Sequence, residues 1–320
     1  MNDQPAVIPP PMPLRRALAA VLAAVAVPLS GCGGAAGEAA SVAPRERLSP
    51  STSASSASPA PQPSARDLPV PDEAIPKDPA RLADALNRTA GHLRDAIDDW
   101  RRTGDPAKGE APEPVVLLSL YEQRVYRYLA RNAKVASRTY GKLPKEEAAR
   151  ARDNVTAIRD LLSLAHPVSG PIKIKVERAE PADVLLADFR RAERRFGVEW
   201  EVLAAVMLVE TKFGRVRSPS YVGARGPMQF MPGTWKAYGM GGDIDDTRDA
   251  LLAAANYLHA SGAPRDYRRA LYAYNHSQAY VDAVLSHARQ MKRDIRNYYA
   301  YYTWQVYVIT TKGERRLTGP

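Results

Sequence analysis

An acidic residue within an apolar helical stretch is the first feature of this sequence that suggests chemistry. From Val198 to Phe213, apolar residues recur at spacings of three and four, which predicts a helix with one apolar face. Glu210 follows Val206 by four residues and Met207 by three, so it lies on that face. A carboxylate in such a place must be paired, solvated from a cleft or kept partly neutral. The neutral form is the one that a general acid needs at neutral pH.

The segment Gly223-Ala-Arg-Gly226-Pro-Met-Gln-Phe-Met-Pro232 follows this helix and suits the binding of a polar ligand. Its glycines allow the backbone to turn tightly beside a ligand. Gln229 offers both a donor and an acceptor, which fits an acetamido group or a hydroxyl. Met228 and Phe230 place apolar surface around it. Gln229 also has a simpler interpretation, as an amide that caps the turn.

The pair Tyr274-Asn275 is a third candidate for the same site. Tyr274 can hydrogen-bond Glu210 or a substrate, and we expect it to tune the pKa of that acid. Asn275 can hold an acetamido group or the backbone. The alternative for Tyr274 is a core residue with a satisfied hydroxyl.

The elements that must position these residues are mainly helices. Periodicity and capping residues predict helices over 78–103, 115–140, 144–164, 181–196, 246–262, 266–275 and 277–288. Residues 172–176 alternate and predict a short strand or an extended linker. Residues 305–309 also alternate, and Lys312-Gly313 offers a turn, so a small C-terminal hairpin is expected. The tyrosine-rich segment 298–304 suits an aromatic seal between tail and domain better than a sugar platform.

Three motifs together resemble the lytic transglycosylases of the soluble-transglycosylase type. These are Glu210-Thr-Lys-Phe-Gly214, the segment from Gly223 to Trp235, and Ala273-Tyr-Asn275. The likeness covers 180–291, about a third of the chain, with Thr211 where many relatives have serine and Pro227 where many have leucine. It implies a mainly α, lysozyme-like catalytic domain.

The resemblance also implies an activity and a set of residues. The family cleaves the β-1,4 bond between N-acetylmuramic acid and N-acetylglucosamine of peptidoglycan without water, giving 1,6-anhydro-muramoyl products. Glu210 matches its only general acid and base. Met228, Gln229, Phe230, Tyr274 and Asn275 match substrate-binding positions. No cofactor or metal is expected, and the partner is the peptidoglycan glycan strand.

Two other functions stay open. A second carboxylate, Asp243 or Asp245, would make the same fold a hydrolytic muramidase. A chain that only binds peptidoglycan would not need an acid on an apolar face. The segment 243–249 invites a calcium-loop interpretation, but Arg248 stands where that loop needs glycine and Ala254 where it needs glutamate. The five histidines show no metal-ligand spacing.

The amino end predicts export and a membrane anchor. Arg15 and Arg16 precede an apolar run over 17–29, which is typical of a secretory signal. The run ends in Leu29-Ser-Gly-Cys32, which resembles a bacterial lipoprotein box and implies cleavage before Cys32, lipidation of its thiol, and a position at the cell envelope facing the wall. An ordinary signal peptide is the alternative, and either Met1 or Met12 can be the start. Cys32 is the single cysteine, which excludes an internal disulfide framework.

Composition and charge complete the expected organisation. The net charge of +10 suits an anionic partner such as nucleic acid, a membrane surface or the cell wall. Basic residues are scattered over helical faces without a nucleic-acid motif, so nucleic acid is not expected. We expect a monomer, divided as follows: 1–31 signal peptide, 32–77 Ala/Ser/Pro-rich disordered tether, 78–176 accessory helical region, 177–295 catalytic domain, and 296–320 aromatic-rich tail with the hairpin.

Overall fold

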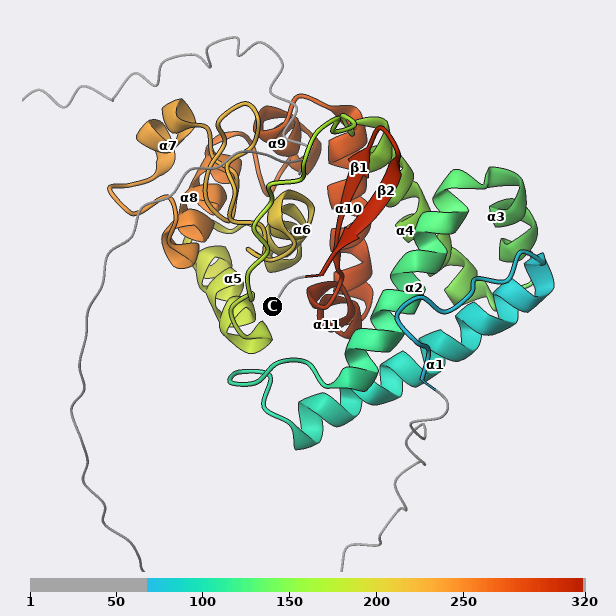
Figure 1. Ribbon diagram of the computed structural model, residues 1–320. Coiled ribbons are helices and arrows are strands. Elements are labelled where there is room, and N and C mark those ends of the chain that lie inside the picture. Colours follow the sequence, from blue (N-terminus) through green and yellow to red (C-terminus); the bar gives the residue numbers. More distant parts are fainter. Residues whose placement is uncertain (1–67, 319–320) are drawn as a thin grey trace, which may run out of the picture.

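The computed structural model describes residues 68–318 and is built mainly from helices (Figure 1). The described residues form α1 Pro79–Thr103, α2 Glu113–Arg131, α3 Ala133–Tyr140, α4 Lys145–Ser163, α5 Ala182–Phe196, α6 Trp200–Thr211, α7 Pro232–Tyr238, α8 Thr247–Ala260, α9 Tyr267–Tyr274, α10 Gln278–Arg293, α11 Arg296–Tyr302, β1 Val306–Thr310 and β2 Gly313–Leu317. β1 and β2 pair antiparallel, with Val306 opposite Leu317. The predicted class, mainly α with a small C-terminal hairpin, is confirmed.

The first four helices occupy the region predicted as accessory. Asp78 caps α1 by accepting hydrogen bonds from two backbone N–H groups of its first turn. The single helix predicted over 115–140 is wrong, because the chain breaks it into α2 and α3. Asn132 has φ −124° and ψ 68°, and its side-chain amide donates to the carbonyl of Tyr128 at 2.7 Å. An asparagine that bonds the backbone in this way competes with the helical ladder.

The helices of the predicted catalytic domain begin and end largely where their capping residues indicate. Asp246, Asp266 and Ser277 each accept a hydrogen bond from a backbone N–H in the first turn of α8, α9 and α10. Gly197 ends α5 in the left-handed conformation, at φ 70°. The short helix α7 was not predicted. Pro232 starts it, and proline suits that position because its missing N–H has no helical partner there.

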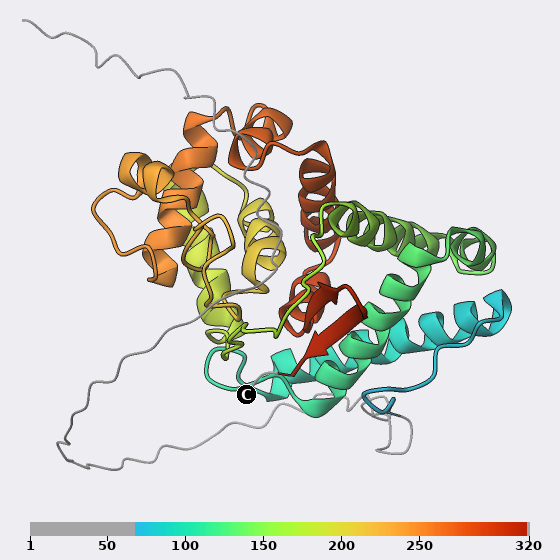
Figure 2. The same cartoon turned by 45° about the horizontal axis from the view of Figure 1, so that its top comes forward.

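Helix α6 lies between α5 and α10 in both views (Figure 1, Figure 2) and forms the centre of this part of the molecule. Its residues from Val202 to Thr211 are buried on every side. The predicted single apolar face is therefore wrong. An apolar helix without a polar face is a core helix, and it needs neighbours all around it. Glu210 is thus embedded in the core rather than set along one stripe.

Helix α11 joins the two helical regions. Its four tyrosine side chains are buried, and their hydroxyls donate to groups on other elements. Tyr298 bonds the carbonyl of Ala182 at 2.7 Å, and Tyr301 bonds the side chain of Asn154 on α4 at 2.7 Å. Trp100 of α1 meets Tyr299 edge to face, with ring centroids 5.6 Å apart. This is the predicted aromatic seal, and a single hydrophobic core runs from α1 through α11.

The segment between α4 and α5 is an extended linker rather than a strand. Val176 forms an isolated antiparallel bridge with Val216, and Val168 forms a parallel one with Thr310. The linker therefore ties the loop after α6 to the C-terminal hairpin. Both bridges are single, which is why no regular strand forms over 172–176.

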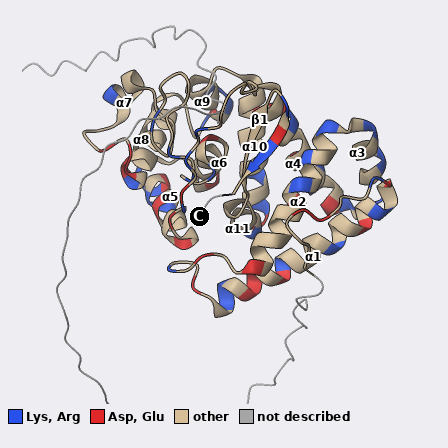
Figure 3. Ribbon diagram, viewed as in Figure 1, with Lys and Arg blue, Asp and Glu red and all other residues tan. Residues whose placement is uncertain are grey.

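Charged residues of both signs are interspersed along the helices, for example on α1 and α5 (Figure 3). Many of them form ion pairs between elements, such as those of Arg289 and Arg293 with Asp153. No helix of residues 68–318 is long and apolar enough to cross a membrane. The predicted signal peptide, Cys32 and most of the predicted tether lie outside the described residues.

Candidate active site

Glu210 lies in the last turn of α6 with 1% of its surface exposed. Tyr280, in the first turn of α10, donates its hydroxyl to Glu210 Oε1 at 2.8 Å. Glu210 Oε2 is buried and has no hydrogen-bond partner among residues 68–318. One oxygen of the carboxyl is therefore held, and the other is left to bear a proton or meet a ligand.

Burial raises the pKa of Glu210 from 4.5 to about 8, because the charged form loses its hydration inside the core. The hydrogen bond from Tyr280 and the charge of Lys212 act in the opposite direction. The carboxyl is consequently neutral at pH 7. This is the protonation state that the position of Glu210 in the sequence predicts, and it is the one that a general acid requires.

The loop over 225–230 is a tight turn fastened beside this carboxyl. Arg225 and Phe230 exchange two backbone hydrogen bonds, at 2.9 and 2.8 Å. Gly226 has φ 73°, and a Cβ there would lie 1.9 Å from the carbonyl oxygen of Ile244. The position thus requires glycine for both conformation and space. Thr211 ties the turn to α6, because its hydroxyl donates to the carbonyl of Pro227 at 2.7 Å.

Tyr274 holds the same turn and does not bond the acid. Its hydroxyl donates to the carbonyl of Met228 at 2.7 Å. Of the two partners that the sequence allows for Tyr274, Glu210 or a substrate, Glu210 is bonded by Tyr280 instead. Tyr274 is nevertheless close enough for the charge of Glu210 to raise its pKa, although burial is the larger cause.

The other residues predicted to bind substrate lie in or near the turn and differ in how much of their surface is exposed. Met228 and Phe230 are 0% and 2% exposed and pack in the core, where Phe230 contacts Tyr274 edge to face. Gln229 is half-buried at φ 52°, and its amide donates to the carbonyl of Gly226 at 3.0 Å, as a turn cap does. Asn275 is 4% exposed, and its Oδ1 has no hydrogen-bond partner within 68–318. Like Glu210 Oε2, that oxygen is an acceptor still to be satisfied.

Carboxylates of the acidic segment over 243–249 accept hydrogen bonds from the backbone of the same segment. Asp249 accepts from the N–H of Asp243 at 2.9 Å, and Asp243 accepts from the N–H of Asp245 at 3.0 Å. Asp245 also pairs with Arg225 at 2.5 Å, which joins this loop to the turn beside Glu210. Residues 68–318 contain no cluster of three or more histidine, cysteine or carboxylate side chains that would hold a metal ion.

Two residues near the acid were missed from the sequence. Tyr280 lies within the helix predicted over 277–288 without a role in the site, and Lys212 has no predicted role either. The signal for Tyr280 is weak: it follows the cap Ser277 by three residues, so it lies in the first turn of α10, close after Asn275. The packing of α10 on α6 brings it to Glu210, 70 residues away in the chain.

Comparison with known proteins agrees with this geometry. Residues 188–297 match the family model described as the transglycosylase SLT domain. No curated protein and no solved structure matches the chain. The matched range is about a third of the chain and includes Glu210, the turn over 225–230, Tyr274 and Tyr280. This match, around a buried acid on a central helix, shows that residues 188–297 form a transglycosylase SLT domain of lysozyme-like fold, which supports a function that acts on peptidoglycan.

Proposed function

We propose that the protein is a lytic transglycosylase that cleaves the bond between N-acetylmuramic acid and N-acetylglucosamine without water, with Glu210 as both acid and base. The observation that carries this proposal is the state of Glu210. It is a buried carboxyl whose pKa is raised to about 8, with one oxygen bonded to Tyr280 and the other unpartnered within 68–318. A neutral carboxyl can give a proton that an ordinary glutamate has already lost at pH 7.

The proposed reaction uses Glu210 twice. Its proton passes to the glycosidic oxygen as the bond to C1 of the muramoyl sugar breaks. The C6 hydroxyl of the same sugar then attacks C1, and the Glu210 carboxylate takes the proton of that hydroxyl. The new C6–O–C1 linkage is the 1,6-anhydro ring, and the acid returns to its starting form. The acetamido oxygen of the substrate supports the positive charge that develops at C1, as in substrate-assisted glycosidases.

Tyr280 and Asn275 have distinct proposed parts in this cycle. The Tyr280 hydroxyl donates to Glu210 Oε1, so it favours the carboxylate that exists between the two proton transfers. Oε2 is then the oxygen that carries the proton. Asn275 is proposed to orient an acetamido group, since its side chain ends in an acceptor without a partner in the described residues. Gln229, Met228, Phe230 and Tyr274 shape the turn against which the sugar would lie.

Purified peptidoglycan and mass analysis of the released fragments test the proposal. The expected fragments are anhydro-muramoyl saccharides, each lighter by one water than the hydrolysis product. Glu210→Gln should release none, whereas Glu201→Gln, in the first turn of the same helix, should behave like the wild type. Fragments that carry the added water would instead indicate a hydrolytic muramidase. Binding without any release would indicate a peptidoglycan-binding lipoprotein, and full activity of Glu210→Gln would exclude Glu210 as the acid.

We further propose that the chain is secreted across the cytoplasmic membrane and anchored to a membrane of the cell envelope by a lipid on Cys32, facing the wall. The support is the apolar run over 17–29 that ends at the only cysteine. Expression of the full chain in a bacterium fed a labelled fatty acid should label it and place it in the membrane fraction. Cys32→Ser should lose both the label and the membrane association. Equal labelling of the variant would contradict the anchor.

A further inference from the structure

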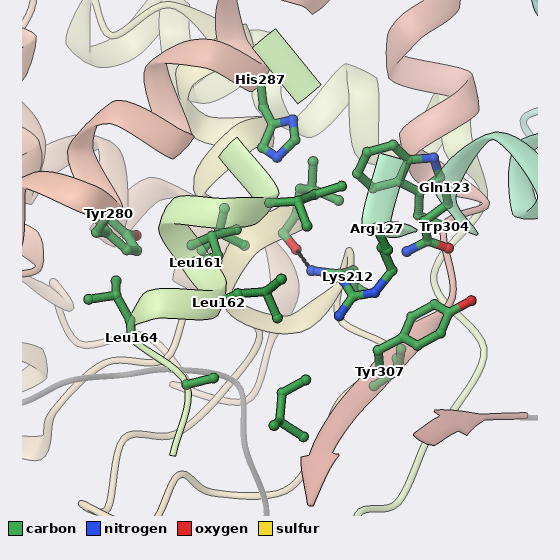
Figure 4. Close-up of a pocket in the computed structure, with 16 residues that line it drawn as sticks. Gln123, Arg127, Leu161, Leu162, Leu164, Lys212, Tyr280, His287, Trp304 and Tyr307 are labelled. Atoms are coloured by element: carbon green, nitrogen blue, oxygen red, sulfur yellow. Dashed lines mark hydrogen bonds between the residues drawn. The ribbon is translucent and has the colours of Figure 1, made fainter. Parts of the chain in front are cut away.

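A second cavity lies next to Tyr280, between α4, α6, α10 and β1 (Figure 4). Its volume is about 100 Å³, and Glu210 is not among its lining residues. Its floor is formed by fully buried side chains, among them Leu208, Tyr280 and Val306. Its mouth is formed by half-buried apolar side chains such as Leu161, Leu162 and Ile309. The proposed reaction uses none of this space.

Lys212 brings a positive charge into this apolar cavity. It follows Thr211 at the end of α6 with φ 53°, a left-handed conformation that non-glycine residues adopt at a cost. Its ammonium donates to the carbonyl of Leu208 at 2.7 Å, the one hydrogen bond drawn in Figure 4. No carboxylate within residues 68–318 lies within ion-pair distance of it. An ammonium has three donors, so two are left for another acceptor.

The charge of Glu210 favours the charged form of Lys212 from beyond ion-pair distance, and the other groups near Lys212 are hydrogen-bond donors rather than a counter-ion. The Arg127 guanidinium lies close to it, near enough to lower the pKa of Lys212, although burial is the larger cause of that shift. Arg127 itself is already paired with Glu314. Trp304 Nε1 is buried and has no hydrogen-bond partner in the described residues, and the same holds for His287 Nδ1. Indole nitrogen is a donor only, so it too awaits an acceptor.

This combination is suited to one class of ligand. A half-buried cation whose one hydrogen bond is to a backbone carbonyl has lost part of its hydration, and an anion that reaches it restores the lost interaction. A small hydrated ion would gain little from the leucine-lined mouth, whereas an aliphatic group next to the anion would bury apolar surface there. We propose that this cavity is a binding site for an aliphatic carboxylate, with Lys212 as its counter-ion and Trp304 as a second donor.

The position of the cavity suggests where such a carboxylate comes from. Tyr280 contacts Glu210 through its hydroxyl and also lines the cavity, and Lys212 directly follows α6, two residues after Glu210. The cavity therefore shares the side chain of Tyr280 with the surroundings of Glu210. The peptide stems of peptidoglycan end in D-alanine, a carboxylate beside a methyl group. This assignment of the source rests on the proposed function, whereas the site itself does not.

Binding measurements on the full chain test the site without turnover. The probes are N-acetyl-D-alanyl-D-alanine, its C-terminal amide and octanoate, each titrated at pH 6.5 by calorimetry and by ligand-observed NMR. The peptide acid should bind, and its amide should bind at least tenfold more weakly. Lys212→Met should weaken the acid at least tenfold, whereas the control Lys236→Met, at an exposed lysine on α7, should not. Leu162→Trp, which fills the mouth and keeps the charge, should also abolish binding.

The outcomes separate this site from the catalytic proposal. Glu210→Gln should bind the peptide acid as the wild type does, because Glu210 does not line the cavity. If Glu210→Gln loses catalysis but still binds the peptide acid, the proposed carboxylate site stands. If Lys212→Met loses binding but still releases anhydro-muramoyl fragments, the proposed transglycosylase activity stands. The site is excluded if acid and amide bind equally, if neither acid binds, or if a folded Lys212→Met binds as well as the wild type. Octanoate that binds tenfold more tightly than the peptide would retain the site but exclude the peptide stem as its source.

Discussion

Replacement of Glu210 by glutamine should stabilise the fold while it removes the proposed acid. The pKa of Glu210 is about 8 in the folded chain, because burial penalises its charge, against 4.5 for an exposed glutamate. Between these two values the folded chain holds a proton that the unfolded chain releases. Stability therefore falls as pH rises through this window. Glutamine has nearly the same shape as glutamate but stays uncharged at every pH in this window. The variant therefore avoids the free-energy cost that burial places on the charged carboxylate.

The size of the effect follows from the width of the window. Each unit of pKa difference corresponds to about 1.4 kcal/mol. At pH 7 the solution is 2.5 units above the pKa of 4.5, so the wild type should be less stable than Glu210→Gln by about 3 kcal/mol. The difference should reach about 5 kcal/mol above pH 8 and vanish near pH 4, where both states of the wild type are protonated.

Denaturant unfolding at a series of pH values between 4 and 8.5 measures this difference. Subtracting the wild-type free energy of unfolding from that of the variant removes the contribution of every other titrating group. Glu146→Gln, at an exposed position of α4, is the matched control and should give no comparable rise. A difference for Glu210→Gln that stays flat from pH 5 to pH 8, or that favours the wild type, would mean that Glu210 is ionised in the fold. The general-acid argument would then fail, whatever the variant does to activity.

Two further changes test the residues around the acid. Tyr280→Phe removes the donor to Glu210 Oε1, a bond to a charged group worth about 1.5–3 kcal/mol, so the pKa of Glu210 should rise by about one to two units. The basic limb of the kcat/KM pH profile should move up by the same amount, and an unchanged limb would contradict the role of Tyr280. Gly226→Ala places a Cβ 1.9 Å from the carbonyl of Ile244 at φ 73°, so unfolding experiments should show a loss of about 2–4 kcal/mol. Gly233→Ala, with nothing within 4 Å, should change stability by less than about 1 kcal/mol, and equal stabilities of these two variants would contradict the packing described for the turn.

Local signals in the sequence are enough to predict where most of the helices lie. Asp246, Asp266 and Ser277 each act as the cap that their position indicates, because capping depends on a few neighbouring residues. The break at Asn132 was missed because the apolar period continues across it, and only the backbone bond of its side chain ends the helix.

The sequence by itself determined the fold class, and it pointed to the proposed acid and the motifs around it, since each rests on residue types at short spacings. It also determined that Glu210 stands among apolar residues, and hence that its carboxyl is neutral or compensated. Which hydroxyl reaches Glu210 was decided only by tertiary structure, because the sequence suggests Tyr274 and the packing of α10 on α6 brings Tyr280 there instead. The cavity at Lys212 likewise exists only in the fold, where residues of α2, α4, α6, α10 and β1 come together around an ammonium whose hydrogen bond is to the backbone carbonyl of Leu208. Such contacts join residues far apart in sequence, and no local propensity specifies them.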